Sequence, residues 1–321
     1  MSKKSFQNLK NLFEKKGYKF RSFDIVSVGD YSPEDADWNY KDIKHLNIAH
    51  KTVYGIQAII TEDVMCNINL QKIPILGFEI PMPLIQYDSS KYNAIYISTL
   101  GPFIIIVKST FELINNDQTK ITTSFSVGSK GIFNIFHLLV ERILKKNNRS
   151  LMNDDIPMRV RRGELRKNDH LFYKNTNSYS FEFSEDIERS NVYLNQNKKK
   201  NIKINISEIL EAKNGDIIGE KTGVLSFFVT IDTDGIKKIW PSTCTHEGAK
   251  LNQKCLKMNF LICPWHNKKI NYLFELVHEN IRIKPNVDYA VKISDTYLNV
   301  QYRNDPKYYD KKPYKFLDYE D

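Results

Sequence analysis

Two short Cys/His pairs toward the C-terminus constrain this chain of 321 residues more than any other feature. Cys244 and His246 form the first pair, and Cys263 and His266 form the second, in the spacing C-x-H-x16-C-x2-H. With only four Cys, the chain cannot form a disulfide framework, so the spacing of these residues carries the information. Each pair places one thiolate and one imidazole on a tight loop, and two such loops together present two Cys and two His.

A Cys2His2 set also suits zinc, so a zinc site is the first alternative. A zinc finger, however, takes both Cys from one loop and both His from a helix, whereas each loop here is mixed and lies among expected strands. A Rieske two-iron two-sulfur cluster needs two Cys on one iron and two His on the other. Residues 203–302 resemble the Rieske domain family at these four positions and at the residues around them, Gly248-Ala249, Leu251 and Pro264-Trp265.

The resemblance implies a 2Fe-2S cluster in which the two Cys hold one iron and the two His hold the other. The respiratory-complex branch of the family joins the loops by a disulfide, but this chain has Ala249 and Trp265 at those positions. The pattern therefore resembles the ferredoxin and oxygenase branch. Asn267 stands where the family usually has Gly, and Asn tolerates a left-handed backbone better than most residues.

The chain before residue 195 has the pattern of an α+β domain. Helical spacing of apolar residues is found within residues 6–13, and a helix is expected from Trp38 to His50. Short β-type runs between Val53 and Val127 predict a largely antiparallel sheet. A helix is then expected between Gly131 and Lys146. Its apolar stripe consists of Phe133, Phe136, His137, Val140, Ile143 and Leu144.

A second group of candidate ligands has the spacing Asn39-x2-Asp42-x2-His45-x4-His50. Two His preceded by a carboxylate could bind a non-haem iron, which uses two His and one carboxylate and keeps positions open for oxygen. His45 and His50 are about 140° apart around an ideal helix. The helix must therefore bend or end if both side chains are to reach one metal.

This spacing resembles the motif of Rieske-type ring-hydroxylating oxygenases. The resemblance implies that His45 and His50 hold a mononuclear Fe(II), that Asn39 supports the motif, and that Asp42 is an electron bridge toward a Rieske His of a neighbouring subunit. Such transfer between subunits implies a homo-oligomer, a trimer. Oxygenases of this type place the Rieske domain first, whereas this chain reverses the order.

The resemblance also implies a third iron ligand, an Asp on the long helix of the catalytic domain. The matching region, residues 153–158, follows the expected helix; Asp155 is favoured and Asp154 is the alternative. Several Arg come next, at positions 159, 161, 162 and 166. They could grip an anionic substrate group or an acidic partner, or they could form a solvated helix face.

These resemblances divide the chain into four segments. Residues 1–194 are expected to form a START-like, helix-grip catalytic domain, 195–202 a linker, 203–302 an all-β Rieske domain, and 303–321 a tail. The function implied is that of an oxidoreductase. It would take electrons from an NAD(P)H-dependent reductase or ferredoxin and pass them from the cluster to the mononuclear iron. It would use O2 to hydroxylate, desaturate or demethylate an apolar small molecule.

The alternative is a START-like domain that binds a hydrophobic ligand, fused to a Rieske ferredoxin and lacking a mononuclear iron. In that case His45 and His50 would be hydrogen-bonded pocket or core residues. The net charge of +9 invites a nucleic-acid partner, but the Lys are scattered and Lys198 to Lys200 form the only tight run. We therefore expect no nucleic acid, and we interpret the charge as serving solubility or docking to an acidic partner.

The most apolar stretch, Tyr92 to Val107, is interrupted by Ser98, Gly101 and Pro102. It is too short for a membrane span, which needs roughly 20 residues. The basic N-terminal sequence lacks the apolar core of a signal peptide. The sequence therefore predicts no membrane span and a cytoplasmic location.

Overall fold

The computed structural model of the chain describes residues 3–41, 45–50, 53–60, 65–72, 79–88, 92–115, 118–167, 201–245, 247–278, 280–286 and 288–302. These residues fall into two compact units, the first within residues 3–163 and the second within residues 164–302. The expected linker up to residue 200 and the expected tail, residues 303–321, lie outside the described residues. Among the described helices, none is long and apolar enough to cross a membrane.

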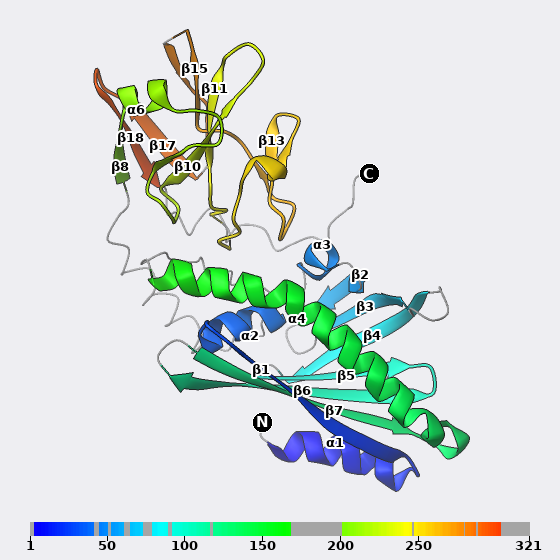
Figure 1. Cartoon of the computed structure of the whole chain (residues 1–321). Helices are drawn as coiled ribbons and strands as arrows, with labels where there is room; N and C mark the ends of the chain where they lie inside the picture. Colours follow the sequence, from blue (N-terminus) through cyan, green and yellow to red (C-terminus); the bar gives the residue numbers. More distant parts are fainter. Residues whose placement is uncertain are drawn as a thin grey trace. The chain divides into compact units, whose positions relative to one another are not determined.

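Among the described residues, the first unit is built on a seven-stranded antiparallel sheet in the order β1-β7-β6-β5-β4-β3-β2 (Figure 1). Its strands are β1 (Lys19–Gly29), β2 (Val53–Ile60), β3 (Met65–Lys72), β4 (Glu79–Asp88), β5 (Asn93–Leu100), β6 (Phe103–Asn115) and β7 (Gln118–Ser129). Its helices are α1 (Lys3–Lys15), α2 (Pro33–Lys41), α3 (Leu46–Ala49), the 3-10 helix η1 (Gly131–Phe136) and α4 (His137–Lys167), of which residues 164–167 are assigned to the second unit. The sequence did not predict β1, an edge strand that pairs with β7 and has no fully buried residue.

The sheet carries a helix on each face. On one face, Leu9 and Phe13 of α1 pack against the cluster that contains Ile95. On the other face, Ile156 of α4 packs against the cluster that contains Tyr96. Ile95 and Tyr96 face opposite ways because successive side chains alternate along a strand. The predicted α+β class, with a long helix against an antiparallel sheet, is thus confirmed.

The helix predicted from Trp38 to His50 is wrong in both its start and its continuity. The Ser32 hydroxyl accepts a hydrogen bond from the Asp35 backbone N–H at 3.3 Å, and the Asp35 carboxylate accepts one from the Ser32 N–H at 3.3 Å. This capping box starts α2 at Pro33, a residue suited to the first helical position. α3 then covers only Leu46–Ala49.

α4 continues well beyond its predicted end at Lys146. Residues 153–158, expected after the helix, lie inside it, and Pro157 is exposed within it. A proline inside a helix costs about 3 kcal/mol. The buried side chains of Met158 and Leu165 supply packing that offsets this cost.

The apolar stripe predicted for this helix is partly wrong. His137 and Val140 are buried, but Phe133 and Phe136 are each 43% exposed. These two Phe lie in η1 rather than in α4. The tighter winding of a 3-10 helix changes the direction of its side chains, so they leave the stripe.

The second unit is rich in β-structure, as predicted. Its described strands form three sheets, in the orders β16-β15-β11-β10-β9, β12-β13-β14 and β17-β18-β8. The strands are β8 (Asn201–Asn205), β9 (Ile217–Gly219), β10 (Ser226–Ile231), β11 (Lys237–Pro241), β12 (Leu256–Lys257), β13 (Phe260–Ile262), β14 (Lys269–Ile270), β15 (Phe274–Val277), β16 (Asn280–Ile283), β17 (Tyr289–Ile293) and β18 (Tyr297–Tyr302). The described helices are α6 (Ile206–Glu211) and the 3-10 helix η2 (Gln253–Cys255).

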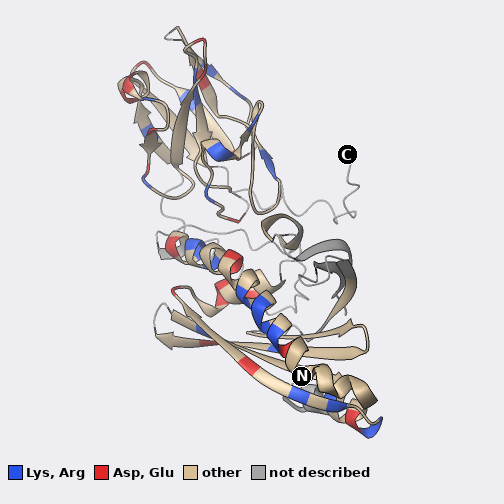
Figure 2. Ribbon diagram, turned by 45° about the vertical axis from the view of Figure 1, so that its right-hand side comes forward, with Lys and Arg blue, Asp and Glu red and all other residues tan. Residues whose placement is uncertain are grey.

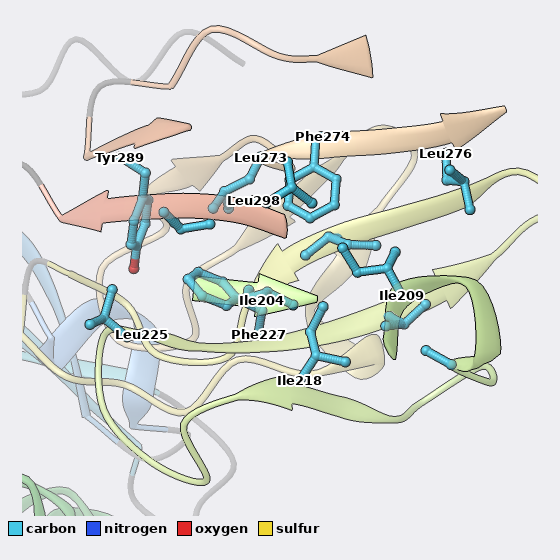
Figure 3. Packing of buried hydrophobic residues seen from close by; sticks show 14 of the residues in the cluster. Ile204, Ile209, Ile218, Leu225, Phe227, Leu273, Phe274, Leu276, Tyr289 and Leu298 are labelled. Atoms are coloured by element: carbon cyan, nitrogen blue, oxygen red, sulfur yellow. The ribbon is translucent and has the colours of Figure 1, made fainter. Parts of the chain in front are cut away.

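One hydrophobic core joins the first and third of these sheets. Phe227 from β10, Phe274 from β15 and Leu298 from β18 are buried in it (Figure 3). The small sheet β12-β13-β14 carries the second Cys/His pair, since Cys263 follows β13 and His266 precedes β14. The core therefore supports a unit whose ligand loops project from strand ends.

Candidate metal centres

His45, His50 and Asp155 come together in the first unit. Their candidate ligand atoms all lie within 4.8 Å of one another, and all three residues are buried. His45 directly precedes α3, His50 directly follows it, and Asp155 lies on α4. His45 has helical backbone angles, whereas His50 is extended with φ −98° and ψ 138°. The helix thus ends between the two His, as one shared metal requires.

The Oδ1 atom of Asp155 lies between the two imidazoles. It is 3.3 Å from Nε2 of His45 and 3.2 Å from Nε2 of His50. Two donors bound at about 2.1 Å and at right angles around one metal would be about 3 Å apart. The spacing and the donor types therefore fit the 2-His-1-carboxylate set of non-haem iron(II).

Asp154 contacts the other ring nitrogen of His50. Its Oδ2 lies 3.2 Å from Nδ1 of His50. With a metal bound at Nε2, a carboxylate in this position would hold the proton of the ring on Nδ1. The two neighbouring Asp thus take different places: Asp155 faces both Nε2 atoms, and Asp154 faces the far side of one ring.

A buried Arg holds the carboxylate of Asp155. Arg159 donates from Nη2 to Oδ2 of Asp155 at 3.2 Å and from Nε to Oδ1 of Asn39 at 2.7 Å. Asn39 donates to Oδ1 of Asp155 at 3.3 Å, and its Nδ2 lies 3.5 Å from Nε2 of His45. The Arg159 guanidinium lies over the rings of Tyr31 and Tyr40, 5.7 Å and 5.0 Å from their centroids.

Electrostatics keep the Asp155 carboxylate ionised. Burial alone raises its pKa, but hydrogen bonds with His45 and His50 and the charge of Arg159 outweigh burial and hold the pKa far below its ordinary value. The same carboxylate raises the pKa of Arg159 against the opposing effect of burial. The centre therefore contains a buried anion with its cation already in place.

For Arg159 and Arg162, two of the four Arg in the run, the structure corrects both interpretations. Arg159 is fully buried in the contacts described above. Arg162 is also buried, with its Nε 3.4 Å from Oδ1 of Asp35 and its guanidinium 3.9 Å from the Trp38 ring centroid. These two side chains are internal partners, not a solvated face or a grip for an external anion. The spacing of Asp155 and Arg159, four residues apart on one helix, was the available sequence signal for their contact.

The two Cys loops of the second unit have the same backbone pattern. The N–H of Cys244 bonds to the carbonyl of Ala249 at 2.8 Å, and the N–H of Gly248 bonds back to Cys244 at 2.9 Å. The N–H of Cys263 bonds to the carbonyl of Lys268 at 2.9 Å, and the N–H of Asn267 bonds back to Cys263 at 2.9 Å.

The fifth residue of each loop adopts the left-handed region. Gly248 has φ 87° and Asn267 has φ 54°. Asn267 thus forms the same turn as Gly248, as its residue type indicated. The two loops are structurally equivalent at the positions that close them.

The two thiols lie side by side in the interior. Cys244 and Cys263 are buried, and neither forms a disulfide. The neighbouring Cys244 thiol, and then burial, raise the pKa of Cys263, while the backbone N–H groups of Trp265 and His266 act in the opposite direction. A bound metal cation would reverse this balance and favour thiolates. Paired thiols with backbone N–H groups directed at sulfur fit an iron-sulfur cluster.

Two predicted residues, Asp42 and His246, lie outside the described residues. Of the four residues that the sequence predicts as cluster ligands, Cys244, Cys263 and His266 are therefore the described ones. Cys255 is partly exposed, with its Sγ 3.9 Å from Oδ1 of Asn252. It belongs to neither ligand loop.

No protein-family model matches the chain, and no curated protein matches it in sequence. Among solved structures, TTHA0849 from Thermus thermophilus is 17% identical, with a TM-score of 0.37 over 44% of this chain and 97% of that chain. The Zhui aromatase/cyclase from Streptomyces sp. R1128 is 9% identical, with a TM-score of 0.37 over 45% and 96%. Norcoclaurine synthase from Thalictrum flavum is 12% identical, with a TM-score of 0.32 over 40% and 82%. Each of these proteins is similar to less than half of this chain.

Proposed function

We propose that this chain is a Rieske-type non-haem iron oxygenase whose catalytic, helix-grip domain comes first. The observation that carries the proposal is the convergence of His45, His50 and Asp155, with all ligand atoms within 4.8 Å of one another. A mononuclear iron bound there, supplied with electrons by a 2Fe-2S cluster, would use O2 to hydroxylate, desaturate or demethylate an apolar substrate.

The surrounding residues would hold the ligands in a fixed arrangement. Asp154 would keep the proton of His50 on Nδ1, so that Nε2 is the donor. Arg159 would hold Oδ2 of Asp155 and leave Oδ1 directed at the two imidazoles. Asn39 would link Arg159 to the ligand pair. Buried apolar side chains on the sheet face toward α4, among them Phe111 and Ile121, support an apolar substrate, and Ser109 and Thr123 add hydroxyl groups to the same face.

The second unit would serve as the electron carrier. The proposal of a Rieske cluster, rather than zinc, is supported by the equivalent loops around Cys244 and Cys263, because each loop pairs its Cys with a His. The electrons would come from an NAD(P)H-dependent reductase or a ferredoxin.

The test is the content of iron and acid-labile sulfide in the full chain purified without oxygen. We expect about three irons for two sulfides, and about two irons for two sulfides in His45→Ala, with the cluster spectrum unchanged. His278→Asn is the matched control, because His278 is exposed and its positive φ suits Asn.

Two results would overturn the proposal in different ways. A wild-type protein with about two irons for two sulfides, even after ferrous iron is added, would be a hydrophobic-ligand-binding domain fused to a Rieske ferredoxin. A wild-type protein that contains zinc and no acid-labile sulfide would contradict the proposed cluster as well.

A further inference from the structure

An exposed apolar surface lies where η1 leads into α4. It is formed by Ile132, Phe133, Ile135, Phe136, Leu138 and Leu139, with exposed fractions between 43% and 71%. We call this set the apolar tip. His137, in the middle of the run, is buried and bonds to the Ser129 hydroxyl at 2.8 Å, so the segment is anchored while its large side chains stay exposed. A contiguous exposed surface of this kind marks an interaction site.

Basic residues lie beside the apolar tip. Lys130 directly precedes it, and the Nζ of Lys130 lies 4.7 Å from the centroid of the Tyr18 ring. That contact places the turn from α1 into β1 next to the tip. The turn carries Lys15, Lys16 and Lys19, all exposed. Figure 2 shows basic residues at this turn and along α4.

Negative charge near the apolar tip is paired with basic side chains; in the neighbouring turn the Glu14 carboxylate lies 3.8 Å from Nζ of Lys10. Between residues 130 and 152 the sequence contains one acidic residue, Glu141. Its carboxylate is paired with Nε of Arg21 at 2.5 Å and with Nζ of Lys145 at 2.7 Å. The exposed Arg142 adds a further positive charge one residue on. The tip is therefore apolar at its centre and positive around it.

We propose that the apolar tip docks the first unit on an anionic lipid bilayer. The large apolar side chains would enter the acyl boundary, and the neighbouring Lys would meet the lipid headgroups. A second copy of the chain fits this surface less well. In a two-fold contact, the basic residues around the tip of one subunit would face the same basic residues of the other subunit and repel them. This docking does not depend on either metal centre.

The test uses the full chain and two vesicle preparations, phosphatidylcholine mixed with phosphatidylserine and phosphatidylcholine alone. We expect cosedimentation with the anionic vesicles, weakened by added salt. In Ile132→Ser/Ile135→Ser, binding should fall about tenfold or more. The matched control is Ile217→Ser/Ile293→Ser, which removes two Ile exposed to 51% and 48% in the second unit.

Circular dichroism should be the same for all variants, because each replaced side chain is exposed. Equal vesicle binding by the wild type and the tip variant would overturn the proposal. The proposal would also be overturned if the wild type does not bind vesicles but forms an oligomer, and if the tip variant alone among the variants fails to form that oligomer. That outcome would assign the tip to a contact between subunits.

Discussion

The two candidate centres are held by different kinds of structure. In the second unit, Cys244 and Cys263 each lie on a loop closed by its own backbone hydrogen bonds. In the first unit, His45 and Asp155 come from distant parts of the chain, and buried Arg159 holds the carboxylate. A locally closed loop keeps its shape when a distant part changes. A centre assembled from remote elements depends on the packing of the whole unit.

The largest effect is expected for Cys263→Ser, which tests whether the centres are independent. On the proposed function, the cluster absorbance and the acid-labile sulfide should be lost, while about one iron remains at the first centre. Cys255→Ser is the matched control and should keep the cluster, because Cys255 lies outside both loops. If Cys263→Ser also empties the first centre, the distinction between a local and an assembled centre fails.

The next effect concerns the stability of the first unit. Arg159→Leu leaves the Asp155 carboxylate buried without its cation, which should lower the free energy of unfolding by about 3–5 kcal/mol. Arg149→Leu, an exposed position on the same helix, should change it by less than about 0.5 kcal/mol. Calorimetry that resolves both units should show the change in one transition only.

Arg159→Lys separates positioning from stability. Lysine keeps the charge but cannot hold Asn39 and Asp155 together as the guanidinium does. We expect this variant to fold and yet to bind iron at the first centre less tightly than the wild type. Wild-type iron affinity in the folded Lys variant would reduce Arg159 to a purely structural role.

The same contrast explains what the sequence could predict. The Cys loops were found from spacing because each is complete within a few residues, and the turn at Asn267 followed from its residue type. The extent of α4 was missed because the apolar pattern stops at Leu144 and residues 145–150 are polar, and because Pro157 is unfavourable inside a helix. The packing of Met158 and Leu165 that offsets it exists only in the folded unit. The helical position of Asp155 therefore could not be derived from local pattern.

The burial of Arg159 illustrates the same limit. In the sequence, the Arg run suggested either an exposed face or a grip for an external anion. The contacts that decide the question come from Tyr31, Tyr40 and Asn39, all far from Arg159 along the chain. A pattern with helical spacing shows which residues share a face, but it does not show what covers that face.

A smaller change in the free energy of unfolding should test whether the two Cys loops are closed in the same way. Asn267 has φ 54°, in the region where a Cβ atom is costly. Asn267→Ala should lower the free energy of unfolding of the second unit by about 1 kcal/mol, and Asn267→Gly should leave it nearly unchanged. Urea unfolding measures both. Equal losses in the two variants would show that the Asn side chain, rather than the backbone, closes the loop.

The smallest effect is expected away from both centres, in the turn between β10 and β11. Burial raises the pKa of Asp232, but backbone N–H groups of Ile236 and Asp234, together with Lys238, outweigh burial and hold the pKa below its ordinary value of 3.8. A carboxylate with a depressed folded pKa stabilises the protein above its unfolded pKa and loses that contribution as the pH falls through the folded value.

The urea midpoint of the second unit should therefore decrease with acid below about pH 4. Asp232→Asn cannot titrate, so its midpoint should vary less over that window, while the first unit keeps the wild-type pH dependence. If both units respond to Asp232→Asn, they do not unfold as separate units. In that case the contrast between a locally closed and an assembled centre would no longer follow from the division of the chain.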